Sequence, residues 1–207
     1  MLQSYLNTYV ERDLRFIENV RDLGEFKRFI SLLAAMTAQE TNESQIGREN
    51  GLSHTTAKRW ISLFQASFQW LEVPAYWGNS IKRISKKRKG YLGDTGLISL
   101  LLKLSSPETI GSSTHFRSLF ESYVLQQIVA ISSSLSLAPT LYHWRSKKGA
   151  EVDLVIEINE KLVPIEIKGR TYITKADLRG IHAFRESYPN RKIETGVIIY
   201  AGERCYI

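Results

Sequence analysis

Residues 149–168 carry the most regular alternation of apolar and polar positions in the chain. Across residues 152–158 and again across 163–168, apolar side chains alternate with charged ones at most positions, and a period of two predicts a pair of strands. Asn159 and Glu160 lie between the two runs and predict a tight turn. The pattern therefore predicts a β-hairpin with one apolar face and one ionic face.

The register of this hairpin places two acids side by side. With the turn at Asn159 and Glu160, counting back along both strands puts Asp153 opposite Glu166, with Cβ atoms roughly 4.5 to 5.5 Å apart. Facing carboxylates repel each other unless a positive charge lies between them. Lys168 on the same face is one candidate counter-charge, and a divalent cation is the other. The alternative is a solvated hairpin whose charges face water, since acidic outer faces are common in antiparallel sheets.

The N-terminal part is predominantly helical by the spacing of its apolar residues, which predicts two packed helices within residues 2–39. From Asn42 the pattern favours a helix-turn-helix. Asn42 with Gln45 resembles a capping box, Gly51 breaks the first helix, and Ser53 caps the second.

The second helix of this motif has two distinct sides. Its predicted buried stripe consists of Ala57, Trp60, Ile61, Phe64 and Phe68. Its polar side carries His54, Thr55, Lys58 and Arg59. Side chains of these types reach phosphates and base edges in the major groove of DNA, so we expect them to contact DNA, although helix-turn-helices also serve as protein-binding modules.

A strongly basic run follows the helix-turn-helix. Residues 82–89, KRISKKRK, hold six positive charges and no acidic residue. Extended segments at residues 68–73 and 80–85, separated by Pro74, predict a two-stranded hairpin, and a helix-turn-helix followed by a basic hairpin favours a winged helix. The predicted DNA-contacting residues of the wing are Lys82, Arg83, Lys86, Lys87, Arg88 and Lys89.

The rest of the chain predicts a second domain. Residues 105–114, rich in Ser with Pro and Gly, predict a linker. We therefore expect a helical lead segment (1–40), a winged helix (41–104) and a C-terminal domain (105–207). In the last of these we expect a helix over about residues 116–131 with Glu121 near its apolar side, then three strands, a helix over about residues 175–186, and strands at about residues 196–201 and 204–207. This order predicts an α/β sheet with a helix on each side.

Composition narrows the function classes. The chain has 207 residues and a formal net charge of +7, which favours polyanionic partners. Its sequence lacks an apolar run long enough to span a bilayer and a signal peptide, and Cys205 is its single cysteine. We therefore expect a cytoplasmic protein. A Walker A loop, a G-x-S-x-G motif and a Cys/His zinc cluster are also absent from the sequence.

The helix acid Glu121, the strand acid Asp153 and the E-x-K sequence at residues 166–168 together resemble the site of the PD-(D/E)XK nuclease superfamily. The resemblance implies a restriction-endonuclease-like, three-layer α/β domain with a mixed sheet. It also implies that Asp153, Glu166 and the carbonyl of Ile167 hold Mg²⁺ or Mn²⁺, that Lys168 positions or activates the attacking water, and that Glu121 assists. Such a site would hydrolyse phosphodiester bonds.

A wider resemblance covers residues 5–200. The segments LSHTTAKRWISLFQASF, KRKGYLGDTGL, GAEVDLVIE and IEIKG resemble the C-terminal part of a large family of bacterial and archaeal AAA-type ATPases. The resemblance implies a winged helix followed by a restriction-endonuclease-like domain, without the ATPase motor. We therefore expect a DNA-binding protein with Mg²⁺-dependent hydrolysis of DNA as the hypothesis to test. The alternatives are a non-catalytic module that associates with an ATPase, and a winged-helix transcriptional regulator.

Overall fold

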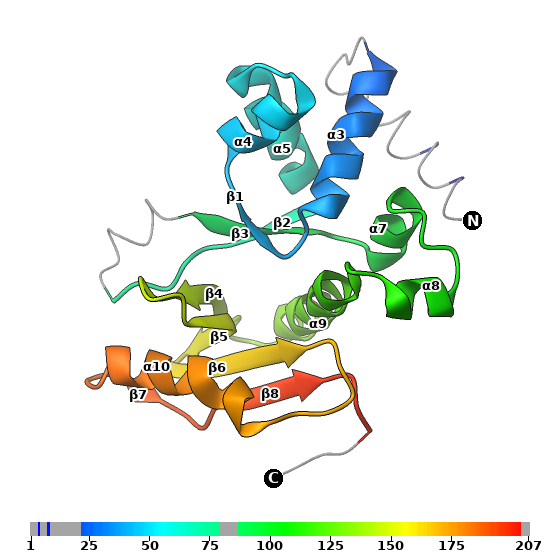
Figure 1. Cartoon of the computed structure of the whole chain (residues 1–207). Helices are drawn as coiled ribbons and strands as arrows, with labels where there is room; N and C mark the ends of the chain where they lie inside the picture. The colour runs from blue at the N-terminus through cyan, green and yellow to red at the C-terminus, as the bar shows by residue number, and fades with distance from the viewer. Residues whose placement is uncertain (1–3, 5–7, 9–21, 79–86, 204–207) are drawn as a thin grey trace. The chain divides into compact units, whose positions relative to one another are not determined.

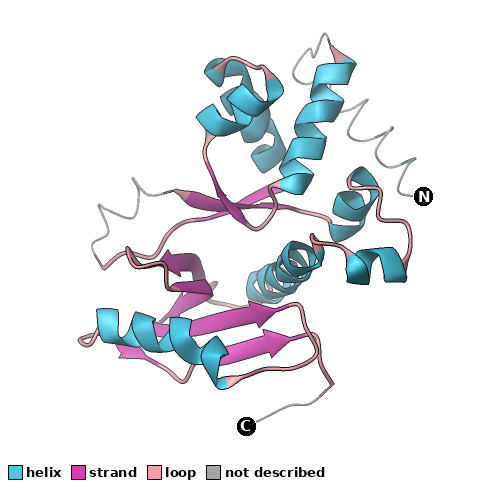
Figure 2. Ribbon diagram, viewed as in Figure 1, coloured by secondary structure: helices cyan, strands magenta, loops and turns pink. Residues whose placement is uncertain are grey.

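Figures 1 and 2 show the computed structural model of the chain, which describes Ser4, Thr8 and residues 22–78 and 87–203. The chain forms two compact units, Met1–Glu72 with Gly90–Ser122 and Val73–Lys89 with Tyr123–Ile207. The division predicted at residues 105–114 lies inside the first of these units, which extends to Ser122, and residues 73–89 group with the C-terminal part. Both units combine helices with strands, so the fold is mixed α/β. None of the helices in the described part of the chain is long and apolar enough to cross a membrane.

Three helices of the first unit follow the predicted pattern. They are α3 (Leu23–Ala35), α4 (Glu43–Asn50) and α5 (His54–Ala66). The side chain of Asn42 accepts the Gln45 N–H at 2.7 Å, and that of Ser53 accepts the Thr56 N–H at 3.1 Å, so both helix starts are capped as predicted. Gly51 ends α4 with a φ of 70°, a conformation that glycine adopts without strain.

The core of the first unit is aromatic. Trp60 and Phe64 of α5 pack against Phe26 and Phe29 of α3, with ring centroids 5.2 to 5.8 Å apart. The predicted stripe is confirmed except at Phe68, which is 80% exposed. That prediction was wrong because α5 ends at Ala66 and Phe68 takes a φ of 59°, which leaves the helical period.

A three-stranded sheet accompanies these helices. Its strands are β1 (Gln39–Thr41), β2 (Trp70–Val73) and β3 (Arg88–Leu92), in the order β1-β3-β2. The backbone of β3 lies very close to β2, since a Cβ on Gly90 would fall 2.0 Å from the Trp70 ring. The strand predicted at residues 80–85 lies outside the described residues.

Three further helices follow: α7 (Thr95–Leu101), α8 (Pro107–Ser112) and α9 (Phe116–Ser133). The linker predicted at residues 105–114 is therefore wrong in part, because it contains α8. Pro107 occupies the start of that helix, where its missing N–H costs nothing, and Ser106 forms a capping box with Thr109. Helix α9 confirms the helix predicted from residue 116.

The second unit is built on a mixed sheet. Its strands are β4 (Thr140–Arg145), β5 (Glu151–Ile158), β6 (Lys161–Lys168), β7 (Lys192–Ile193) and β8 (Val197–Tyr200). Strands β4, β5 and β6 are antiparallel, whereas β7 and β8 both pair with β6 in parallel. Asn159 and Glu160 form the β5–β6 turn with φ of 49° and 62°, as predicted.

One face of this sheet is covered by a helix. The helix predicted from residue 175 divides into a 3₁₀ turn, η2 (Lys175–Leu178), and α10 (Arg179–Ser187), which packs on β5 and β6 (Figure 1). Phe184 of α10 lies in a core with Tyr142, Trp144 and Leu162. The short strand β7 was missed, and the strand predicted at residues 204–207 lies outside the described residues.

Residues 74–76 extend the same unit. The Tyr76 N–H donates to the His143 carbonyl at 2.6 Å, and the His143 N–H donates to the Pro74 carbonyl at 3.0 Å. This parallel bridge between Ala75 and His143 ties the segment before the basic run to strand β4.

Candidate functional site

Strands β5 and β6 bring two carboxylates together. The register pairs Leu154 with Ile165, so Asp153 and Glu166 are the next pair along the same two strands, as predicted. Lys168 follows two residues after Glu166 on the same face. The predicted group of Asp153, Glu166 and Lys168 therefore assembles at one place in the sheet.

The carboxylates are buried. Asp153 is 1% exposed and Glu166 3%. Helix α10 reaches this face, and a Cβ on Gly180 would lie 2.1 Å from Glu166 Oε1 and 2.0 Å from the Glu151 carbonyl oxygen. The alternative of a solvated ionic face is therefore wrong. Alternation along the sequence shows which residues share a face of the sheet, but it does not show that a helix covers that face.

Asp153 is neutralised from two directions. Its Oδ2 accepts the backbone N–H of Ile167 at 2.9 Å and lies 3.7 Å from Lys168 Nζ. Its Oδ1 lies 3.6 Å from Lys89 Nζ, and the Lys89 side chain is only 12% exposed. Lys89, the last residue of the basic run, thus belongs to the cluster of Asp153, Glu166, Lys168 and Lys89, which we call the carboxylate–lysine cluster.

Glu166 is the group with the most altered acidity. Its Oε2 accepts a hydrogen bond from Lys168 Nζ at 2.7 Å. Burial, and after it the charge of Asp153, raise the pKa of Glu166, while Lys168 opposes both, and the net result is a pKa of about 8. The proton of Glu166 is therefore held more tightly than that of an exposed glutamic acid.

The cluster as arranged does not fit the predicted divalent cation. Hard cations take ionised oxygen ligands, but the ammonium groups of Lys168 and Lys89 lie 3.7 and 3.6 Å from the Asp153 oxygens, and Lys168 Nζ also donates to Glu166 Oε2. Within residues 22–78 and 87–203, His, Cys, Asp and Glu side chains form no group of three or more that could hold a metal. The predicted role of Ile167 concerns its carbonyl, whereas the contact observed is made by its N–H, which donates to Asp153 Oδ2.

Glu121 lies in the first unit, on α9. It is 3% exposed, and its Oε1 accepts a hydrogen bond from the Tyr91 hydroxyl at 2.7 Å. The prediction that this carboxylate sits on the apolar side of its helix is confirmed. Tyr91, which donates this hydrogen bond, lies on β3 in the same unit.

The predicted DNA-contacting residues of α5 lie at the surface. His54, Thr55, Lys58 and Arg59 are all exposed. His54 Nε2 lies 3.4 Å from a carboxylate oxygen of Glu43 on α4. The helix thus presents a polar face next to its capped start.

Part of the basic run is described. Lys87 and Arg88 are exposed, whereas Lys89 contacts Asp153. His143 Nε2 lies 3.2 Å from the Lys87 carbonyl oxygen, and because a carbonyl only accepts, that nitrogen carries the proton. Lys82, Arg83 and Lys86 lie outside the described residues.

Comparison with known families divides the chain in two. Residues 1–108, more than half of the chain, match the family described as Domain of unknown function (DUF8612). The chain belongs to the DUF8612 family. Residues 116–206 match a second family, Domain of unknown function (DUF4143). Helix α5 and its polar face therefore lie in the DUF8612 region, and the paired carboxylates lie in the DUF4143 region.

Two mycobacterial proteins resemble nearly the whole chain. The uncharacterised proteins Rv2008c of Mycobacterium tuberculosis (strain H37Rv) and Mb2031c of Mycobacterium bovis are each 26% identical to it over 203 residues. The similarity covers 98% of this chain and 44% of each relative, so the chain spans less than half the length of the curated relatives it matches. No solved structure matches the chain.

Sequence reasoning missed two contributors to the cluster. Lys89 of the DUF8612 region has no sequence feature that separates it from its basic neighbours, and only the fold brings it to Asp153. Gly180 of the DUF4143 region permits the close approach of α10 to Glu166. A glycine at the start of an amphipathic helix was the available signal, since glycine there often marks close backbone packing.

Proposed function

We propose that the DUF8612 region binds duplex DNA as a winged helix, with α5 as the recognition helix. The observation that carries the proposal is the exposed row of His54, Thr55, Lys58 and Arg59 on one face of α5. The opposite face packs into the aromatic core, so the polar row is held on a rigid element. Such a row supplies cations for phosphates and hydrogen-bonding groups for base edges.

The order of elements supports the same reading. The succession α3, β1, α4, α5, β2 and β3, with the sheet order β1-β3-β2, supports the proposal of a winged helix. In this reading Lys87 and Arg88 belong to the wing and grip the DNA backbone. The net charge of +7 adds long-range attraction for DNA.

The test compares two double variants that lose the same charges. Lys58→Ala with Arg59→Ala removes two cations from α5, whereas Lys27→Ala with Arg28→Ala removes an exposed Lys-Arg pair from α3. Binding of a fluorescent duplex is measured by anisotropy at several salt concentrations. The α5 variant should lose at least tenfold in affinity, and its slope of log affinity against log salt should fall by about two.

The α3 variant should bind within about threefold of the unchanged protein. Equal losses in the two variants would mean that the chain attracts DNA only through its net charge. Binding of duplex by neither protein nor variant would also contradict the proposal.

A second candidate is metal-dependent cleavage of DNA by a restriction-endonuclease-like DUF4143 region. The observation that favours it is the meeting of Asp153, Glu166 and Lys168 at one point of the sheet. A divalent cation would first have to displace the lysine contacts of Asp153. Cleavage of branched, single-stranded and duplex DNA with Mg²⁺ or Mn²⁺ should then be lost in Asp153→Ala. Equal activity in both proteins, or none in either, contradicts cleavage.

The rival to cleavage is a non-catalytic module that associates with an ATPase, and the two lysines in the cluster favour it. Under this rival, Lys89 and Lys168 replace the metal permanently. Calorimetric titration with Mn²⁺ separates the two: heat that disappears in Asp153→Asn supports a metal site. The absence of heat in the unchanged protein supports the non-catalytic module.

A further inference from the structure

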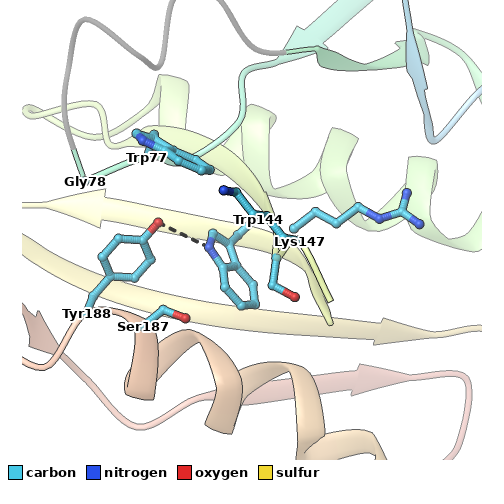
Figure 3. A pocket seen from close by; sticks show the side chains of 8 residues that line it. Trp77, Gly78, Trp144, Lys147, Ser187 and Tyr188 are labelled. Atoms are coloured by element: carbon cyan, nitrogen blue, oxygen red, sulfur yellow. Dashed lines mark hydrogen bonds between the residues drawn. The ribbon is translucent and has the colours of Figure 1, made fainter. Parts of the chain in front are cut away.

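The second unit holds a pocket away from the carboxylate–lysine cluster. It has a volume of about 380 Å³, at the lower end of the range of small-ligand sites of about 300 to 1,000 Å³. Three aromatic residues line it from three different segments: Trp77, Trp144 at the end of β4, and Tyr188 after α10. Figure 3 shows these rings around the opening.

The pocket wall is ordered by packing before any ligand enters. Trp144, 3% exposed, donates its indole N–H to the Tyr188 hydroxyl at 3.3 Å. The Tyr188 ring also lies 5.1 Å from the rings of both Tyr76 and Phe184. Gly78 adds close contact, since a Cβ there would lie 3.2 Å from Tyr188. Fixed rings lose little entropy when a planar ligand stacks on them.

The pocket carries positive charge. Among the described residues that line it, Arg145 and Lys147 are the charged ones, and both are exposed. Ser146 between them is fixed, because its hydroxyl accepts the Ala150 N–H at 2.9 Å and so closes the β4–β5 loop. The site therefore combines apolar ring surface with two cations on one loop.

We infer that this pocket binds a nucleotide, with the base against the rings of Trp77 and Tyr188 and the phosphate at Arg145 and Lys147. A planar base suits an aromatic wall, and a phosphate suits a loop with two cations. A cationic ligand would use the same rings but would be repelled by the loop. An apolar ligand would leave the two cations without a partner.

The ligand chemistry has two sources, a free nucleotide or one unit of a single strand of DNA. Calorimetry with the full chain uses deoxyadenosine monophosphate, deoxyadenosine, inorganic phosphate and a short deoxyadenosine oligonucleotide. The monophosphate should bind at least tenfold more tightly than the nucleoside or phosphate alone. An oligonucleotide that binds more than tenfold more tightly than the monophosphate identifies a strand as the source, and comparable affinities identify the free nucleotide.

Matched variants test the two halves of the pocket. Trp77→Ala should weaken binding of the monophosphate about tenfold or more, whereas Tyr172→Ala, which removes a ring 59% exposed elsewhere in the unit, should not. Lys147→Ala should cost about tenfold, and Lys175→Ala, also an exposed lysine, should cost little. Trp77→Phe keeps a ring and should retain most of the affinity, which guards against misfolding of the alanine variant.

Three results would overturn the inference. They are phosphate binding as tight as the monophosphate, equal losses in Trp77→Ala and Tyr172→Ala, and no binding of any of the four probes. The duplex-binding proposal is tested separately, because Lys58→Ala with Arg59→Ala leaves the pocket unchanged. Failure of one proposal therefore does not decide the other.

Discussion

The polar face of α5 and the polar face of the β5–β6 hairpin both carry charged side chains, but they use them in opposite ways. On α5, Lys58 and Arg59 are exposed and lie over an apolar core. On the hairpin, Asp153 and Glu166 are buried and meet Lys168 and Lys89 within 3.7 Å. Charge at the first face is exposed to solvent, whereas charge at the second is buried and matched inside the molecule.

An alternation of charged and apolar residues in a sequence does not show whether the charged side chains face water. Each charge of a buried ion pair has lost its contact with water, and only the attraction of its partner compensates for that loss. Removal of one member therefore leaves an uncompensated buried charge. An exposed charge keeps its contact with water, so removal of its partner changes the stability very little. The two faces should therefore respond to the same substitution by very different amounts.

Lys168→Met should give the largest difference in the free energy of unfolding between the two faces. It leaves Asp153 and Glu166 buried with one fewer cation and should lower the free energy of unfolding by about 3 kcal/mol, the lower end for a broken buried pair, because Lys168 is 19% exposed. Lys58→Met on α5 is the matched control and should change it by less than about 0.5 kcal/mol. Urea denaturation of both variants measures the contrast, and similar effects would abolish the distinction between the faces.

Glu166→Gln tests the proton held in the cluster. The pKa of Glu166 is about 8 in the folded chain against 4.5 as its ordinary value, so the folded state binds the proton more tightly. The stability that this proton confers is full below pH 4.5 and is lost as the pH rises toward 8. The loss within that window is about 1.4 kcal/mol per pH unit.

Glutamine imitates the protonated acid at every pH. The stability of Glu166→Gln relative to the unchanged protein should therefore rise between pH 5 and pH 8, as measured by urea denaturation at each pH. Glu186→Gln, an exposed acid on α10, serves as the control for a change in net charge. A parallel pH dependence of Glu166→Gln and the unchanged protein would show that Glu166 is ionised.

Gly180→Ala tests how closely α10 covers the cluster. The new Cβ would lie 2.0 Å from the Glu151 carbonyl and 2.1 Å from Glu166 Oε1, so α10 must move away from the sheet. Such overpacking costs about 1 to 3 kcal/mol. Gly111→Ala in α8 meets no atom within 4 Å and should be neutral or slightly stabilising. Thermal denaturation compares the two, and an unchanged midpoint for Gly180→Ala would contradict the close contact.

Local signals made much of this fold predictable. The caps at Asn42 and Ser53, the left-handed Gly51 and the Asn159–Glu160 turn each act within four residues, so the sequence alone contains the relevant interaction. The turn then fixed the register that pairs the acids, because strand pairing is counted from it.

The features that the sequence did not predict depend on residues far apart in the chain. Lys89 reaches Asp153 only because residues 73–89 group with the second unit and are tied to β4 through His143. The cover of α10 over Glu166 likewise joins segments that share no local pattern. The prediction that Phe68 is buried was wrong for a different reason. Helix α5 ends at Ala66, two residues earlier, so Phe68 is not part of the apolar stripe.

Ser53→Ala, at the start of α5, has the smallest expected effect on stability. The Ser53 hydroxyl accepts the Thr56 N–H at the start of α5, and loss of such a cap costs about 1 kcal/mol. Ser62→Ala, on the exposed side of the same helix, should be neutral or stabilise slightly, because alanine is the better helix former. If the polar row of α5 binds DNA, loss of the cap should also weaken duplex binding, since His54 and Thr55 are the first residues after it. A loss of stability without any loss of binding, measured by urea denaturation and anisotropy on the same samples, would place the DNA contact away from the start of α5.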